Sequence, residues 1–213
     1  MTLRLFLLRH GQTALSRANM FCGGRLDPPL TADGERMAAA FAECYARTPW
    51  QAIYASPLQR ALHTAAPLAR VTGLTVHTRE GLTEIDYGQW DGKSVAEVDR
   101  EHHDEYERWV ADPAWNPPTG GETAVALAQR VTHVFEGVRA AHPDGNVLVV
   151  SHKATIRVAL CALLGVDVGR FRYRFGCPVG SVSIIEFGGH GPLADTVADR
   201  SHLPSELRAL EGT

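Results

Sequence analysis

Short apolar segments alternate with longer amphipathic segments along most of this chain. The segments that suit buried strands are residues 3–8, 52–55, 74–77 and 146–150. Residues 181–187 alternate in polarity, which predicts a last strand. Segments with helical spacing separate these strands. The order predicts a single α/β domain of three layers, in which a mostly parallel sheet is flanked by helices.

Helix-start signals mark several of the amphipathic segments. Thr31 is a suitable N-cap, and Ser56 followed by Pro57 is typical of a cap and a first helical position. Ser94 and Glu97 have the spacing of a capping box. Helices are therefore predicted over residues 31–47, 56–73, 94–110, 122–141 and 154–164.

Length and composition bound the class of protein. A chain of 213 residues suits one domain over residues 1–213, with a polar C-terminal tail over 188–213 and one short helix near Glu206. The net charge is -3 and the basic residues are scattered, so neither nucleic acid nor a membrane is expected as a partner. Apolar runs of about 18 residues, as in a membrane-spanning helix, are absent.

Two further observations predict a cytoplasmic protein. The N-terminus lacks the basic region and long apolar segment of a secretory signal. The cysteines, Cys22, Cys44, Cys161 and Cys177, show no C-x-x-C spacing and are interpreted as reduced thiols.

Charged and nucleophilic residues follow the predicted strands. Arg9, His10 and Gly11 end the first apolar run, and His152 follows the run at 146–150. Arg60 lies one turn into the helix after the second strand. The carboxyl ends of parallel strands meet at one edge of a sheet, where ligands bind in open α/β folds. We therefore expect these side chains to converge.

Two arginines and two histidines at one edge form a cationic pocket that matches the dispersed charge of a phosphoryl group in transfer. The neutral imidazole of His10 can attack phosphorus, which divides one difficult step into two easier ones. The departing alkoxide needs a proton, and either Glu84 or Asp86 could supply it. Zinc ligation by the two histidines is disfavoured, because Arg9 and Arg60 would repel a divalent cation.

Several motifs together carry a family resemblance. They are Arg9-His10-Gly11-Gln12-Thr13, residues 23–31, residues 55–61, Glu84 with Gly88 and Trp90, residues 120–123, and Val150-Ser151-His152. In this order they resemble the histidine phosphatase superfamily, which has the phosphoglycerate mutase-like fold. The resemblance covers nearly the whole chain.

The resemblance implies a set of roles. His10 would be the phosphorylated nucleophile, and Glu84, rather than Asp86, the proton donor and later the base that activates water. Arg9, Arg60 and His152 would hold the phosphoryl oxygens. Further phosphate-binding positions would be Gln12, Thr13, Ser16, Gly23 and Lys153, and candidates for the substrate rim are Arg25, Tyr87, Trp90 and His202. No metal or other cofactor would be required.

Two positions depart from the family pattern. Members often carry Asn where this chain has Ser16, so one phosphate contact is shortened or lost. Gly often follows the second histidine, where this chain has Lys153. The lysine either extends the anion pocket or points into solvent, and the sequence leaves both open.

These residues predict a metal-independent phosphomonoesterase that acts through a phosphohistidine on a small phosphorylated metabolite. The residues after Glu84 resemble the phosphatase branch, and residues 161–166 and 201–203 are similar to metal-independent phosphoserine phosphatases. Sugar phosphates remain an alternative substrate class. A cofactor-dependent phosphoglycerate mutase and a non-catalytic protein that binds phosphorylated ligands are the other hypotheses. The family resemblance also makes a homodimer an alternative to a monomer.

Overall fold

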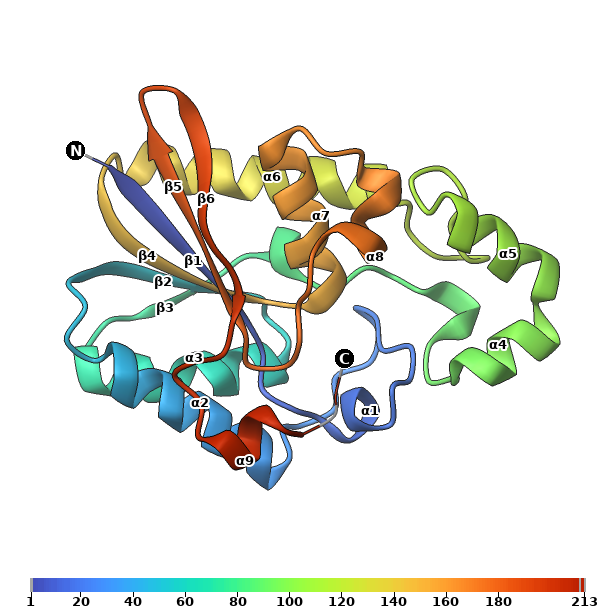
Figure 1. The fold of residues 1–213 in the computed structure, drawn as a ribbon, viewed down its shortest axis with the longest axis horizontal. Helices are drawn as coiled ribbons and strands as arrows, with labels where there is room; N and C mark the ends of the chain where they lie inside the picture. The colour runs from blue at the N-terminus through green and yellow to red at the C-terminus, as the bar shows by residue number, and fades with distance from the viewer. Residues whose placement is uncertain (1, 211, 213) are drawn as a thin grey trace.

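The computed structural model describes residues 2–210 and 212, which fold around one twisted sheet (Figure 1). Its strands are β1 (Leu3–Arg9), β2 (Trp50–Ala55), β3 (Val76–Thr78), β4 (Gly145–Ser151), β5 (Val182–Gly188) and β6 (Gly191–Asp199). They lie in the order β3-β2-β4-β1-β5-β6. The pairs among β3, β2, β4 and β1 are parallel, and β5 and β6 are antiparallel to their neighbours. The predicted mostly parallel sheet is confirmed.

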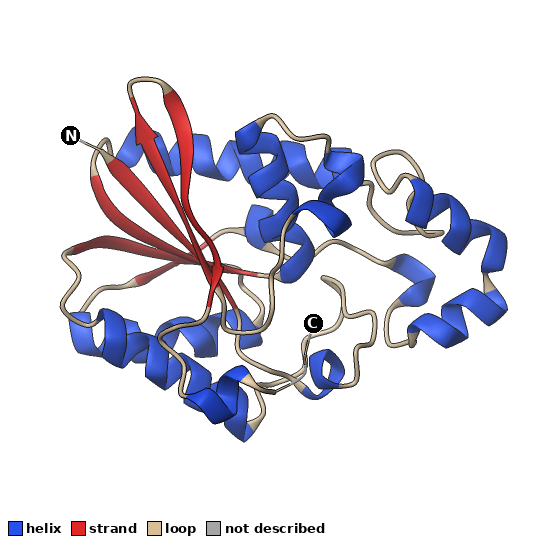
Figure 2. Ribbon diagram, viewed as in Figure 1, coloured by secondary structure: helices blue, strands red, loops and turns tan. Residues whose placement is uncertain are grey.

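Helices cover both faces of the sheet and complete three layers (Figure 2). One face carries α2 (Ala32–Tyr45) and α3 (Gln59–Thr72), and the other carries α6 (Ala124–Ala141) and α7 (Lys153–Leu164). A helical extension, α4 (Val95–Glu101) and α5 (His103–Ala111), projects beyond the sheet. Short helices are α1 (Ala14–Arg17), α8 (Phe171–Arg174) and α9 (Ser205–Arg208), with 3-10 turns η1 (Glu80–Leu82), η2 (Gly88–Trp90) and η3 (Val168–Arg170). None of the helices described is both long and apolar enough to cross a bilayer.

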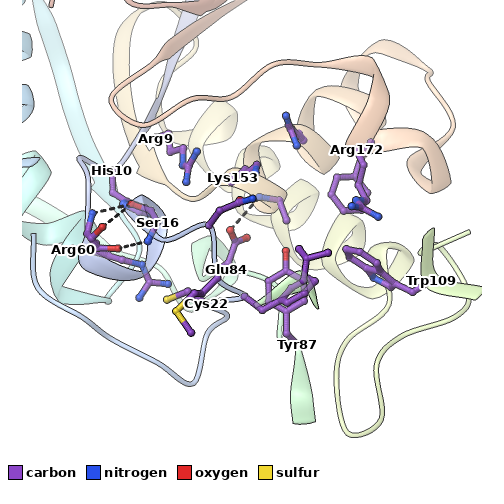
Figure 3. A pocket seen from close by; sticks show the side chains of 18 residues that line it. Arg9, His10, Ser16, Cys22, Arg60, Glu84, Tyr87, Trp109, Lys153 and Arg172 are labelled. Atoms are coloured by element: carbon purple, nitrogen blue, oxygen red, sulfur yellow. Dashed lines mark hydrogen bonds between the residues drawn. The ribbon is translucent and has the colours of Figure 1, made fainter. Parts of the chain in front are cut away.

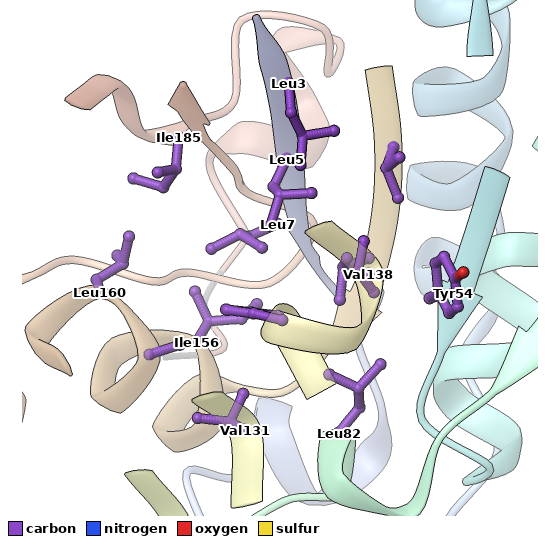
Figure 4. Packing of buried hydrophobic residues seen from close by; sticks show 14 of the residues in the cluster. Leu3, Leu5, Leu7, Tyr54, Leu82, Val131, Val138, Ile156, Leu160 and Ile185 are labelled. Atoms are coloured by element: carbon purple, nitrogen blue, oxygen red, sulfur yellow. The ribbon is translucent and has the colours of Figure 1, made fainter. Parts of the chain in front are cut away.

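Strand β1 divides the interior into two cores. Leu3, Leu5 and Leu7 face α6 and α7, as Figure 4 shows. Phe6 and Leu8 point the other way, into the core beneath α2 and α3. Side chains alternate across a strand, so an unbroken apolar run fills both cores. The run of residues 5–8 is apolar throughout for this reason, whereas Arg4 forms a salt bridge with Glu186.

Strand register brings the candidate site together. Arg9 on β1 pairs with Ser151 on β4, so the next residues, His10 and His152, leave the sheet side by side. The His10 amide donates to the Ser151 carbonyl oxygen at 3.0 Å. The Ser56 amide, at the end of β2, donates to the Val150 carbonyl oxygen at 3.0 Å. Three strands therefore deliver polar side chains to one edge.

Two predicted helices have different ends in the structure. Helix α3 begins at Gln59 rather than at Ser56-Pro57, and its N-cap Leu58 has no side-chain hydrogen bond to the helix. The Ser56 hydroxyl instead lies 2.8 Å from His152 Nε2, so the residue expected to be a cap belongs to the site. The helix predicted over 94–110 is broken at His102, whose φ of -138° is outside the helical range.

The polar tail predicted over residues 188–213, of which 211 and 213 lie outside the described residues, contains a strand that the sequence did not predict. Strand β6 lies at the edge of the sheet and pairs only with β5 among the described strands. Its exposed positions include Leu193, which keeps 61% of its surface accessible. An edge strand exposed in this way carries a weak hydrophobic pattern, so the sequence did not distinguish it from a loop. The predicted short helix near Glu206 is confirmed as α9.

A close backbone contact anchors the loop after β1 against α2. A Cβ on Gly34 would lie 2.2 Å from the Gln12 carbonyl oxygen, and a Cβ on Gly11 would lie 2.3 Å from the Gly34 carbonyl oxygen. Both positions require glycine because the two backbones approach without space for a side chain.

This contact predicts that Gly34→Ala destabilises the fold, because the added methyl group forces the backbones apart. We expect a loss of about 1–3 kcal/mol in the free energy of unfolding, measured by urea denaturation. Gly137→Ala is the control, since its Cβ would meet nothing within 4 Å. It should be neutral, or stabilise α6 by up to about 1 kcal/mol. Equal midpoints for both variants would contradict the steric account.

Candidate active site

A cavity of about 250 Å³ lies at the edge where β1 and β4 end (Figure 3). The residues that line it are Arg9, His10, Thr13, Ser16, Asn19, Met20, Phe21, Cys22, Arg60, Glu84, Tyr87, Val95, Trp109, Lys153, Ala154, Arg157, Phe171 and Arg172. His10 and Arg60 lie at one end, Trp109 and Arg172 at the other, with Glu84 and Lys153 between them. The cavity thus joins the strand ends to the helical extension.

His10 is held as a neutral imidazole with one nitrogen available. Its Nδ1 lies 2.7 Å from the Gly11 carbonyl oxygen, which can only accept, so Nδ1 carries the proton. The lone pair is therefore on Nε2. Burial lowers the pKa of His10 well below its usual value, and the charges of Arg60 and Arg9 lower it further. His10 has the form that a nucleophile requires.

Arg60 is almost fully buried and organises the loop after Cys22. Its Nη1 donates to the Leu26 carbonyl oxygen at 2.6 Å, and its Nη2 donates to the Gly23 carbonyl oxygen at 3.1 Å. Asp27 Oδ1 lies 3.5 Å from Nη1. Gly23 therefore contributes its backbone oxygen to the site, and its own amide donates to Asp91 Oδ1. The guanidinium is fixed beside His10 by these contacts.

His152 lies behind His10, with 5.1 Å between the ring centroids. Its Nδ1 accepts from Arg60 Nε at 3.2 Å, so Nε2 carries the proton and donates to the Ser56 hydroxyl oxygen. Burial, followed by the charge of Arg60, lowers its pKa well below the usual value. In this arrangement His152 positions Arg60, and its N–H is not directed into the cavity.

Arg9 is buried at the end of β1. Its Nη1 donates to the Cys177 carbonyl oxygen at 2.6 Å, and its Nε has no hydrogen-bond partner among the described residues. Burial lowers the pKa of the guanidinium, which still remains charged at neutral pH. Arg9 therefore adds a fixed positive charge to the wall beside His10.

Glu84 is 6% exposed, and the N-terminus of α7 holds its carboxylate. Oε1 accepts from the Ile85 amide at 2.9 Å and from the Thr155 amide and hydroxyl at 3.1 and 3.0 Å. Oε2 accepts from the Ala154 amide at 3.1 Å. These bonds fix both oxygens at the cavity wall. The rival residue, Asp86, forms a salt bridge with Arg25 and does not line the cavity.

Thr13 and Ser16 line the cavity from α1. They form a capping box, in which the Ser16 amide donates to Thr13 Oγ1 and the Thr13 amide donates to Ser16 Oγ. Ser16 Oγ also donates to the Thr13 carbonyl oxygen at 3.0 Å. The expected phosphate contact of Ser16 thus competes with local bonds that hold the short helix.

Lys153 is the first residue of α7, and its side chain lines the cavity. The alternative in which it points away into solvent is therefore wrong. Burial lowers its pKa to about 7, and the neighbouring charges of Arg9 and Arg157 contribute to the shift. The lysine adds a titratable positive charge to the anion pocket.

Several expected site residues lie elsewhere. Trp90 is fully buried in an aromatic cluster with Phe21 and Trp109, and His202 packs against Phe41 of α2, so neither forms the substrate rim. Arg25 is held by Asp86 and Gly120 beside a separate, more open depression. Gln12 does not line the cavity, because its Oε1 accepts from the Thr31 hydroxyl. Tyr87 is the rim candidate that does line it.

The sequence interpretation missed most of the far wall. Phe21, Trp109, Arg157, Phe171 and Arg172 all line the cavity. Arg157 follows Lys153 by one helical turn, and this spacing could have identified it. Arg172 and the aromatic residues come from segments far apart in the chain, and no local pattern marks them. Within the described residues, no group of three His, Cys, Asp or Glu side chains is placed to hold a metal ion.

Comparisons with known proteins agree with this geometry. The family model for the histidine phosphatase superfamily (branch 1) matches residues 5–200. Phosphoserine phosphatase 1 of Hydrogenobacter thermophilus is 36% identical over 182 residues, which cover 85% of each protein. A bifunctional protein of Mycobacterium tuberculosis is 37% identical over 189 residues, 88% of this chain and 51% of that protein. This chain therefore spans about half of the latter protein.

A solved structure extends the similarity to the fold. The native structure of a mycobacterial glucosyl-3-phosphoglycerate phosphatase aligns with a TM-score of 0.86 at 28% identity, covering 94% of this chain and 100% of that chain. The chain belongs to the histidine phosphatase superfamily. It is a phosphatase of this family, a phosphoric monoester hydrolase for small phosphorylated metabolites.

The lowered pKa of Lys153 predicts a pH dependence of anion binding. Lys153 is charged below pH 7 and neutral above it, so binding of sulfate should weaken about tenfold between pH 6 and pH 8. Sulfate keeps its own charge over this range, and titration calorimetry measures its affinity. Lys153→Met should remove most of this dependence. The control Lys93→Met, on a surface residue paired with Glu101, should retain it. An unchanged slope in Lys153→Met would contradict the assignment.

Proposed function

We propose that this protein hydrolyses a small phosphomonoester without a metal, through a phosphohistidine at His10. The observation that carries the proposal is the state of His10: its Nδ1 proton is held by Gly11, and its Nε2 lone pair is available. The two flanking guanidiniums of Arg9 and Arg60 provide fixed positive charge for the phosphoryl oxygens. Phosphoserine-like compounds and sugar phosphates are the candidate substrate classes.

The reaction has two steps. In the first, His10 Nε2 attacks phosphorus, the P–O bond to the leaving group breaks, and Glu84 gives that oxygen a proton. In the second, Glu84 takes a proton from water as the water attacks phosphorus and the P–N bond breaks. Inorganic phosphate leaves, His10 is neutral again and Glu84 has its proton back.

Fixed geometry favours this sequence of steps. Glu84 is held by four donated hydrogen bonds, so its oxygens do not have to reorganise when the substrate arrives. His152 holds Arg60 through its Nδ1, which keeps the guanidinium beside the nucleophile. The presence of His10 and Glu84 in one cavity disfavours a role confined to binding. A mutase would use the same first step but return the phosphoryl group to a second substrate oxygen.

His10→Ala should abolish phosphate release, because no other imidazole lines the cavity in the described part of the chain. The measurement is release of phosphate from phosphoserine, sugar phosphates and p-nitrophenyl phosphate in the presence of EDTA. When the reaction with a substrate labelled in its phosphoryl group is stopped rapidly without acid, phosphohistidine should be trapped in the parent protein and not in His10→Ala. Near-normal turnover by His10→Ala would reject the mechanism, and isomerised phosphoglycerate without released phosphate would favour a mutase.

Glu84→Gln should affect substrates according to their leaving groups. An alkoxide needs a proton to leave, whereas a nitrophenolate does not, so kcat on an alkyl phosphate should fall about 10²–10⁴-fold. The fall in phosphorylation rate with p-nitrophenyl phosphate, measured as the pre-steady-state burst, should be much smaller. Equal losses on both substrates would remove Glu84 from the role of acid. Asp86→Asn is the matched control and should change neither rate by more than about twofold.

A further inference from the structure

The cavity carries more positive charge than the proposed phosphoryl transfer uses. Its lining includes five cationic side chains, Arg9, Arg60, Lys153, Arg157 and Arg172, and one acidic side chain, Glu84. A phosphate dianion supplies two negative charges, and Glu84 supplies a third once it has given up its proton. Even with one phosphate bound, the four arginines exceed these negative charges by one, and a protonated Lys153 raises the excess to two.

The surplus charges gather away from His10. Lys153 and Arg157 lie one turn apart on α7 and share a face of that helix. Arg172 comes from α8, and its guanidinium carbon lies 4.1 Å from the ring centroid of Trp109. In Figure 3, Arg172 and Trp109 occupy the end of the cavity opposite His10. The cavity thus has a second cationic region with an aromatic support.

Donors in this region lack partners. Arg157 Nε and Arg172 Nη1 are both buried without a hydrogen-bond partner in the part of the chain that the structure describes. Leaving a buried donor unsatisfied is unfavourable, and more so when the donor is charged. A ligand that accepts hydrogen bonds from both donors when it binds would explain why the protein itself provides no partner for them.

We propose that Lys153, Arg157 and Arg172 form a second anion subsite, which binds a carboxylate of the substrate while His10 and its neighbours bind the phosphoryl group. This inference rests on the proposed phosphatase function and narrows its substrate class to small phosphorylated carboxylic acids. A carboxylate is compact and planar, so it fits a cavity of about 250 Å³ and accepts from a guanidinium in bidentate fashion.

The same charges disfavour a free ammonium group on the substrate. Glu84 is the acidic residue of the lining, and its two oxygens already accept four hydrogen bonds from the protein. Tyr87 offers no negative charge either, because burial raises the pKa of its phenol. An ammonium beside Lys153 and Arg157 would meet like charge. A phosphorylated hydroxy acid therefore fits better than phosphoserine.

The electrostatics of Lys153 agree with this account. Its pKa is lowered by burial first and then by Arg9 and Arg157, so the lysine is crowded by positive charge. A bound carboxylate would supply the missing negative charge and favour its protonated form. The subsite should therefore bind a proton together with the acid.

The test compares 3-phosphoglycerate with glycerol 3-phosphate, which has a hydroxymethyl group in place of the carboxylate. The parent protein should prefer 3-phosphoglycerate by at least about tenfold in kcat/KM, and should prefer it to phosphoserine as well. Arg172→Gln and Arg157→Gln should each lower kcat/KM for 3-phosphoglycerate by about 10–100-fold, since each loses a charged hydrogen bond. The loss with glycerol 3-phosphate should be less than about threefold.

Arg174→Gln is the matched control, because Arg174 lies on α8 two residues from Arg172 and is exposed. It should leave both substrates unaffected. Equal losses on both substrates in Arg172→Gln, a parent protein indifferent to the carboxylate, or a preference for phosphoserine would each overturn the proposal.

A binding measurement keeps this test separate from the proposed catalysis. In His10→Ala protein, calorimetry should show tighter binding of 3-phosphoglycerate than of glycerol 3-phosphate, and Arg172→Gln in that background should remove the difference. If the parent protein hydrolyses no phosphomonoester but this difference holds, the proposed chemistry fails and the subsite stands. If hydrolysis proceeds through His10 without the difference, the subsite fails alone.

Discussion

The parallel pairing of β1 with β4 is the constraint on which the rest of the site depends. Because Arg9 lies opposite Ser151, the residues that follow, His10 and His152, leave the sheet together. A shift by one residue would turn every β1 side chain to the other face and exchange the two cores. The apolar side chains of Leu3 and of residues 5–8, which fill both cores, make that shift costly. Packing of the core therefore fixes the positions of the groups that we propose for catalysis.

Burial then controls the protonation of these groups. Two imidazoles beside two guanidiniums would be unfavourable if they were charged, and both histidines have pKa values well below the usual one. A local hydrogen bond fixes the tautomer of each neutral ring. The partner is the Gly11 carbonyl oxygen for His10 and Arg60 Nε for His152. One ring is left with an available lone pair, while the other serves as a support for Arg60.

The helical extension supplies what the sheet edge lacks. Strand ends and the first turns of α3 and α7 provide the groups that we propose for phosphoryl transfer. The far wall, with Trp109 from α5 and Arg172 from α8, extends the cavity beyond the phosphoryl group. In our proposal the sheet edge therefore carries out the reaction, and the far wall selects the substrate.

The sequence by itself determined the strand ends and the residues found there, because residue periodicity and Arg-His-Gly or Ser-His at the end of an apolar run are local signals. It also predicted the three layers and most helices. The tertiary structure alone decided that β6 completes the sheet, that Ser56 contacts His152 rather than capping α3, and that Trp90 and His202 lie away from the cavity. It also brought Arg157 and Arg172 together. These outcomes depend on contacts between segments distant in sequence, and the local pattern of a segment does not record which partner will cover it.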